Sequence, residues 1–135
     1  MKIILPFTVT IPRKTKADKV FVLNLNNFRN AHHFTMNQAK ILWKDVVLGS
    51  LDGFNVNGPE AIIPPFRFTY TVFPGSNRKF DIGNVLPAVE KFTDDALIEL
   101  GIIPDDSYKV IPAIDYRFGG VDKENPRIEL EITGC

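Results

Sequence analysis

Carboxylates, an amide and a lysine gather in one stretch of the second half of the chain. Asp81 precedes a segment of helical periodicity, and an Asp-Asp pair follows that segment. The polar residues in and around it are Asp81, Asn84, Lys91, Asp95, Asp105 and Asp106. Asn84, Lys91 and Asp95 lie at i, i+7 and i+11, which places them within about 20° of one another around a helix. The spacing predicts one polar stripe along the helix.

Clustered carboxylates repel one another unless a hard cation neutralises them, so this stretch suggests a divalent metal site. Mg²⁺ takes one or two carboxylates and keeps waters that phosphate oxygens can replace. Such an ion polarises a phosphoryl group and activates water, while a nearby lysine stabilises the developing charge. Asp81 and Asp106 flank the helix, so they meet only if the chain after the helix returns beside its start.

Each of these residues also has an ordinary structural interpretation. Asp81 has the position of a helix N-cap, and Pro104-Asp105-Asp106-Ser107 has the composition of a turn. Lys91 and Asp95 are four residues apart, the spacing of a solvated surface pair. The residues alone leave both interpretations open.

Charge is divided unevenly along the chain. The formal net charge is zero, which argues against a nucleic-acid-binding protein. Up to Leu51, however, eight basic residues face two acidic ones, and the rest of the chain has eight basic against fourteen acidic. A polyanion could therefore lie on the first half while metal ions lie in the second.

Hydrophobic periodicity predicts an α+β domain over residues 1–135, with a single mixed β-sheet and two helices. The predicted strands are 3–11, 20–25, 66–73, 108–116 and 127–133, and the predicted helices are 35–48 and 85–100. Thr35 is the expected N-cap of the first helix, and Gly101 is expected to end the second. The amide-rich segment 24–30 is predicted to be a turn, and Gly119-Gly120 and Asn125-Pro126 suggest a hairpin between the last two strands.

Several classes of protein and site are disfavoured. No apolar run approaches the roughly 18 residues of a membrane span, so no membrane partner is expected. His32 and His33 have no second partner at metal-ligand spacing, which disfavours zinc. The one cysteine, Cys135, cannot form an intrachain disulfide, and a reducing compartment such as cytoplasm is expected.

The order of motifs over residues 66–133 resembles the RusA-like Holliday junction resolvases, a family of crossover junction endodeoxyribonucleases. That family has a basic loop, an Asp that opens a helix, a Lys further along, a Gly at the helix end and an Asp-Asp pair before the closing strands. The matching residues here are Arg78, Lys79, Asp81, Asn84, Lys91, Asp95-Ala96-Leu97, Gly101 and Asp105-Asp106, followed by the closing strand 127–133.

The resemblance implies a RusA-like endonuclease domain that hydrolyses phosphodiester bonds in four-way and other branched DNA. It implies a homodimer with Mg²⁺, or alternatively Mn²⁺, and a place in bacterial cytoplasm, encoded by a phage or prophage. Asp81, Lys91 and Asp106 are then the expected catalytic residues, with Asp81, Asp106, Asp105 and Asp95 as candidate metal ligands. The expected DNA contacts are Arg78, Lys79, Asn84, Arg13, Lys14, Lys16, Arg29 and Lys40.

Two departures from the family pattern bear on the metal site. Gly83 stands where the family commonly has a second Asp, and the segment from Asn84 to Lys91 is about one helical turn longer. A junction-binding protein of the same fold with impaired catalysis is therefore an alternative. The zero net charge motivates a third hypothesis, an interaction module unrelated to nucleic acid.

Overall fold

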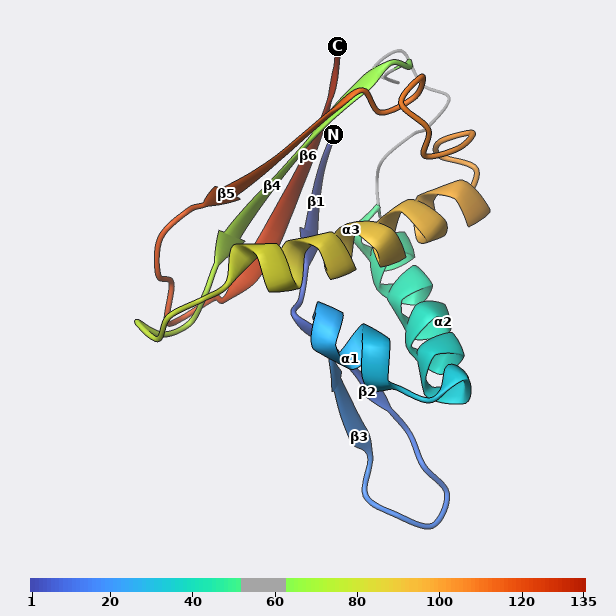
Figure 1. Cartoon of the computed structure of the whole chain (residues 1–135), viewed down its shortest axis with the longest axis vertical. Helices are drawn as coiled ribbons and strands as arrows, with labels where there is room; N and C mark the ends of the chain where they lie inside the picture. The colour runs from blue at the N-terminus through green and yellow to red at the C-terminus, as the bar shows by residue number, and fades with distance from the viewer. Residues whose placement is uncertain (52–62) are drawn as a thin grey trace.

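The computed structural model describes residues 1–51 and 63–135, and its centre is a four-stranded mixed sheet. The strands are β1 (Lys2–Leu5), β4 (Phe66–Phe73), β5 (Ala113–Phe118) and β6 (Arg127–Gly134). Their order across the sheet is β1-β6-β4-β5, with β4 and β5 parallel and the other neighbours antiparallel. Two further strands, β2 (Thr8–Ile11) and β3 (Lys19–Val22), form a separate antiparallel hairpin that extends from the body (Figure 1).

Three helices lie among the described residues. They are α1 (Leu25–Asn30), α2 (His33–Ser50) and α3 (Ile82–Glu99). Figure 1 shows α3 crossing the strands of the main sheet, with α1 and α2 close to it. None of these helices is both long and apolar enough to cross a membrane.

Buried side chains alternate with less buried ones along the strands, and the buried ones form the core. In β4 the side chains of Phe66, Phe68, Tyr70 and Val72 are buried, while the residues between them are less so. Ile128, Leu130 and Ile132 of β6 are buried in the same way. These side chains belong to one hydrophobic cluster with Leu86, Val89 and Phe92 of α3, so α3 covers this face of the sheet.

A buried hydrogen bond joins α2 to α3. Trp43 is fully buried, and its indole Nε1 donates to Oγ1 of Thr93 at 3.0 Å. The polar atom of the tryptophan is thus satisfied, as it generally is in buried indole groups. The bond links the buried sides of α2 and α3.

The α+β class and the mixed sheet are confirmed, but several details of the prediction are wrong. The strand predicted over 3–11 is two strands in different sheets, so there are two sheets among the described residues instead of one. The segment 24–30 forms α1, capped by Asn24 Oδ1, which accepts from the Asn27 amide at 2.7 Å. The described chain therefore has three helices instead of two. The N-cap of α2 is His32, and not Thr35.

The predicted hairpin between the last two strands is also wrong, because β4 lies between β5 and β6. The strand expected over 108–116 begins only at Ala113. Pro112 explains the late start, since proline is favoured just before or at the first residue of a strand. This arrangement makes β5 an edge strand of the main sheet, a point that matters below.

Candidate functional site

The two carboxylates that were expected to share an ion lie in different parts of the α3 region. Asp81 is the N-cap of α3, although its side chain makes no capping hydrogen bond. Asp106 lies in the segment after the other end of the helix (Figure 1) and affects the pKa values of Glu90 and Asp94. Asp94 is thirteen residues beyond Asp81, or roughly 20 Å along a helix. The chain does not bring Asp106 back to the start of α3.

Instead, Asp106 joins two carboxyl groups on α3 that the sequence had not singled out. Glu90 and Asp94 are one helical turn apart, and Asp94 is 6% exposed. Burial raises the pKa of the Asp94 carboxyl to about 8, and the charges of Glu90 and Asp106 add to the shift. Burial likewise raises the pKa of Glu90, with a smaller contribution from Asp106. We call Glu90, Asp94 and Asp106 the acidic cluster.

Two tyrosines of the sheet complete the surroundings of the acidic cluster. Tyr70 and Tyr116 are partners on β4 and β5, with ring centroids 6.0 Å apart. Burial and the nearby charges of Asp94 and Glu90 raise the pKa of Tyr70. Burial also raises the pKa of Tyr116, and a hydrogen bond between Tyr116 and Glu90 holds the pKa of Glu90 down against the effect of its own burial. Both phenols are therefore neutral proton donors near the carboxylates.

Some polar atoms of the acidic cluster and of Tyr70 are buried without a hydrogen-bond partner in the described part of the chain. Among the described residues, the Tyr70 hydroxyl, Oε1 of Glu90 and Oδ1 of Asp94 are buried without a hydrogen-bond partner. Most buried polar atoms in proteins are paired, and an unpaired one costs on the order of 1–3 kcal/mol. Two of the three atoms belong to carboxyl groups of the acidic cluster, which therefore has hydrogen-bond acceptors that the described residues do not use.

The residues of the predicted polar stripe lie on another side of α3. Oδ2 of Asp95 accepts an ion pair from Nζ of Lys40 at 2.9 Å, which links α3 to α2. Lys91 is exposed, and Asn84 is partly exposed. Because Asp95 and Lys40 neutralise each other, the pair has a structural role, whereas the buried Asp94 is the residue whose pKa the charge of Asp106 raises.

Asp105, another predicted ligand, has the role of a turn residue. Its Oδ1 accepts a hydrogen bond from the Ser107 amide at 2.8 Å. Hydrogen bonds from Ser107 lower the pKa of the Asp105 carboxyl. This turn presents the next residue, Asp106, toward α3, so the Pro-Asp-Asp-Ser sequence combines its ordinary turn chemistry with placement of a site residue.

The donor set of the acidic cluster fits a hard divalent cation. Three carboxylates, two of them with unpaired buried oxygens, are the ligand type that Mg²⁺ and Mn²⁺ prefer. As placed in residues 1–51 and 63–135, however, no three acidic, histidine or cysteine side chains form a group that could hold a metal ion, and this includes the acidic cluster. Asp106 is exposed and lies in a loop, so rotation of its side chain is the adjustment that an ion would need.

The predicted DNA contacts lie on the surface. Arg78 and Lys79 are exposed before α3, and Arg29 is exposed in the last turn of α1. Arg13, Lys14 and Lys16 are exposed in the turn between β2 and β3, where Nε of Arg13 donates to the Ala17 carbonyl at 2.7 Å. This basic turn stands at the tip of the hairpin that extends from the body (Figure 1).

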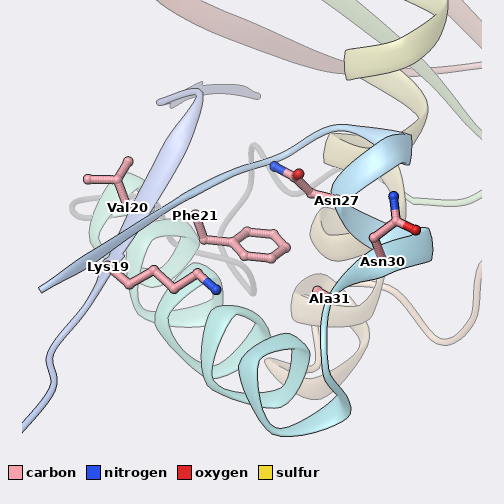
Figure 2. Close-up of a pocket in the computed structure, with 6 residues that line it drawn as sticks. All are labelled: Lys19, Val20, Phe21, Asn27, Asn30 and Ala31. Carbon is pink, nitrogen blue, oxygen red and sulfur yellow. The ribbon is translucent and has the colours of Figure 1, made fainter.

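A cavity at the base of the hairpin adds a polar site that the sequence did not reveal. It has a volume of about 230 Å³ and lies between β3 and α1. Figure 2 shows Lys19 and Phe21 from β3 and Asn27 and Asn30 from α1 around it. Ammonium and amide groups hydrogen-bond phosphate oxygens, so the cavity suits one phosphate of a nucleic-acid backbone. The amide-rich composition of segment 24–30 was the available signal.

The sequence did contain a signal for Glu90 and Asp94 as well. The buried side of α3 includes Leu86 and Leu97, and Glu90 and Asp94 follow Leu86 at i+4 and i+8, within about 80° of it around the helix. Two carboxylates at the border of an apolar stripe, one turn apart, are unfavourable unless they have a function.

Comparison with known protein families finds no family model that matches the sequence, and comparison with curated proteins finds no match.

Proposed function

We propose that this protein is a magnesium-dependent endonuclease that cuts branched DNA, with four-way junctions as the preferred substrate. The observation that carries the proposal is the acidic cluster, in which Glu90 and Asp94 each have a buried oxygen without a partner among the described residues and the charge of Asp106 helps to raise both pKa values. The motif order around α3, which resembles the RusA-like resolvases, supports the choice of DNA substrate.

The proposal changes the assignment of the site residues. Glu90, Asp94 and Asp106 are the residues that would hold the ion, in place of Asp81, Asp95 and Asp105. When bound, Mg²⁺ (or Mn²⁺) supplies polarisation of the phosphoryl group and a more acidic water. The loss of an acidic residue at Gly83 then matters little, because the carboxylates come from the middle of α3.

The chain's own residues have separate tasks in this proposal. Deprotonated Glu90 and Asp94 would attract the cation, and the hydrogen bond with the Tyr116 hydroxyl favours the charged form of Glu90 against the larger effect of burial on its pKa. Lys91, next to Glu90 but exposed, is placed to reach a DNA phosphate outside the cluster. The Tyr70 hydroxyl is buried near these groups, and the charges of Asp94 and Glu90 help to raise its pKa, so it stays protonated.

The residues proposed to bind the DNA backbone lie in the first half of the chain. The basic turn between β2 and β3 and the Lys19 cavity give exposed cationic and amide groups, which bind phosphates without reading sequence. Paired nicks across a junction need two acidic clusters, so the proposal includes two chains for each junction.

The decisive experiment measures cleavage of a synthetic four-way junction, with linear duplex of the same sequence for comparison. We expect Mg²⁺-dependent cutting of the junction, and a loss of at least about 100-fold for Glu90→Gln, Asp94→Asn and Asp106→Asn. Asp95→Asn is the matched control, since it changes the neighbouring carboxylate and should reduce the rate no more than about threefold.

Three outcomes would contradict the proposal or part of it. Equal cutting of junction and duplex would remove the junction preference. Full activity of Asp94→Asn together with inactive Asp81→Asn would return the site to the start of α3. Salt-sensitive binding of the junction with no product in Mg²⁺ or Mn²⁺ would indicate a junction-binding protein without catalysis.

A further inference from the structure

The outer edge of β5 is an unpaired strand edge with apolar side chains. β5 is the last strand in the order β1-β6-β4-β5, and no strand of residues 1–51 or 63–135 pairs with its other side. Ile114, Tyr116 and Phe118 are 41%, 37% and 55% exposed on it. An exposed edge with such side chains is prone to pair with another strand unless the protein prevents it.

The parallel pairing with β4 determines which backbone groups of β5 point outward. The Gly119 amide donates to the Val72 carbonyl at 2.8 Å, in register with the pairing of Val72 and Phe118. In a parallel ladder the N–H and C=O of alternate residues point to the same neighbour. Arg117, Asp115 and Ala113 therefore bond toward β4, and the backbones of residues 114, 116 and 118 point outward.

The side chains of β5 are complementary to those of a second, antiparallel β5. If Tyr116 lies opposite Tyr116 of the second copy, then Ile114 lies opposite Phe118, and Asp115 lies opposite Arg117. The outward-pointing backbones of residues 114, 116 and 118 are then directly paired, which gives about six main-chain hydrogen bonds. Asp115 and Arg117 fall at the non-hydrogen-bonded positions, where opposite side chains are closest.

This register is favoured over its neighbours by charge. A shift that keeps the same backbone groups paired moves the strands by two residues. In one direction Asp115 then faces Asp115 of the other copy, and in the other direction Arg117 faces Arg117. Like charges directly opposite one another are destabilising in antiparallel pairs. The sequence Ile-Asp-Tyr-Arg-Phe is thus self-complementary in one register only.

We propose that two copies of this chain associate through antiparallel pairing of their β5 strands about a two-fold axis at Tyr116. The two main sheets become one continuous sheet, and both α3 helices lie on the same face of it. Because Tyr116 also contacts Glu90, the axis brings the two acidic clusters toward each other. The inference depends on the strand edge alone and makes no use of the proposed nuclease activity.

The test is a charge-exchange experiment read out by sedimentation equilibrium of the full chain without DNA. The wild-type protein is expected to be a dimer. Arg117→Asp makes carboxylates face each other at both places where Asp115 meets position 117 of the other copy, so this variant is expected to be monomeric. A second variant carries Asp115→Arg together with Arg67→Ala, which removes the arginine that contacts Asp115 at 3.0 Å within the chain. It is also expected to be monomeric.

Mixing the two variants restores opposite charges at both positions, so a one-to-one mixture is expected to form a heterodimer. Lys14→Asp, with the same change of charge in the β2–β3 turn, is the control and is expected to remain dimeric. A monomeric wild-type protein, a dimeric Arg117→Asp variant or a mixture that stays monomeric would each overturn the proposal. Circular dichroism melts of every variant exclude unfolding as the cause of a lost dimer.

Discussion

Asp94 and Asp95 are consecutive residues of α3, yet their carboxyl groups have opposite environments. Asp95 forms an ion pair with Lys40 at the junction of two helices, whereas Asp94 is buried with one oxygen unpaired among the described residues. Successive residues of a helix are separated by about 100°, which is enough to turn one carboxylate toward the sheet and the other toward α2. The difference produces a stability effect that depends on pH.

We expect the protein to lose stability as the pH rises from about 4 to about 8. Burial raises the pKa of Asp94 from 3.8 to about 8, so in this range the unfolded chain releases a proton that the folded chain retains. Folding is then penalised progressively, by about 2–4 kcal/mol in total, since one pKa unit corresponds to about 1.4 kcal/mol and residual solvation reduces the effect. Urea unfolding at several pH values measures this, in the absence of divalent ions.

Asp94→Asn should flatten this pH dependence, because the amide does not titrate, whereas Asp95→Asn should retain it. An unchanged slope in Asp94→Asn would show that other groups dominate the titration.

Divalent ions should offset the loss of folding stability that the ionisation of Asp94 causes at high pH. An ion that binds only the folded state stabilises it in proportion to the logarithm of its concentration above the dissociation constant. Mg²⁺ needs charged carboxylates, so the rise in melting temperature should be larger above pH 8 than at pH 5. The effect should vanish in Asp94→Asn and persist in Asp95→Asn. Ca²⁺ should stabilise as well, because it shares the preference for carboxylates. Equal stabilisation at both pH values would argue for ion binding elsewhere.

Tyr116→Phe should make Glu90 harder to ionise. The hydrogen bond from Tyr116 lowers the pKa of Glu90, against the larger effect of burial that raises it. Its loss therefore raises the pKa of Glu90, and the acidic limb of the pH–rate profile for junction cutting should move to higher pH. Carbon NMR titration of the Glu90 carboxyl measures the same shift without activity. A limb that moves to lower pH, or a Glu90 titration that does not move, would contradict the assigned contact.

Elements with a strong local pattern were predicted well from the sequence. The strand 66–73 alternates along its whole length and is found with the same bounds as β4. The end of α3 follows from Gly101, which has φ +76°, a conformation that glycine adopts without strain. The pairing of strands was not predictable in this way, because insertion of β4 between β5 and β6 depends on contacts between distant segments.

The candidate site was predicted only in part. Asp106 was identified because two adjacent aspartates follow a helix end, but its partners on α3 were not. Glu90 and Asp94 stand next to Lys91 and Asp95, which offered an equally good polar stripe. The choice between the two stripes depends on how α3 is rotated in the fold, to which the bond between Trp43 and Thr93 contributes along with the apolar side chains. A bond between residues fifty positions apart is not visible in local periodicity.

Lys19 should contribute to DNA binding through the cavity between β3 and α1. Its ammonium group is among the polar groups that line the cavity, so Lys19→Ala removes one phosphate contact. Affinity for junction and duplex should fall alike, and the slope of log K against log salt should become less steep by about 1. Lys2→Ala is the control, because Lys2 pairs with Glu129 at 2.7 Å on the main sheet. An unchanged salt slope for Lys19→Ala would remove the cavity from the DNA-binding surface.

Two glycine-to-alanine substitutions should change stability in opposite directions. A Cβ at Gly119 would lie 2.4 Å from Cε1 of Phe73 and 2.8 Å from Cγ2 of Thr71, with the backbone bonded to Val72. The Phe73 ring, over which the Arg127 guanidinium lies at 4.1 Å, and the Thr71 methyl group must shift to make room, so Gly119→Ala should cost about 1–3 kcal/mol. At Gly49, inside α2, a Cβ meets nothing within 4 Å among the described residues. Gly49→Ala should therefore stabilise by about 0.4–1 kcal/mol, since alanine favours helix and restricts the unfolded chain. Chemical denaturation of both variants measures the difference, and a neutral Gly119→Ala would show that the end of β5 moves apart from β4 easily.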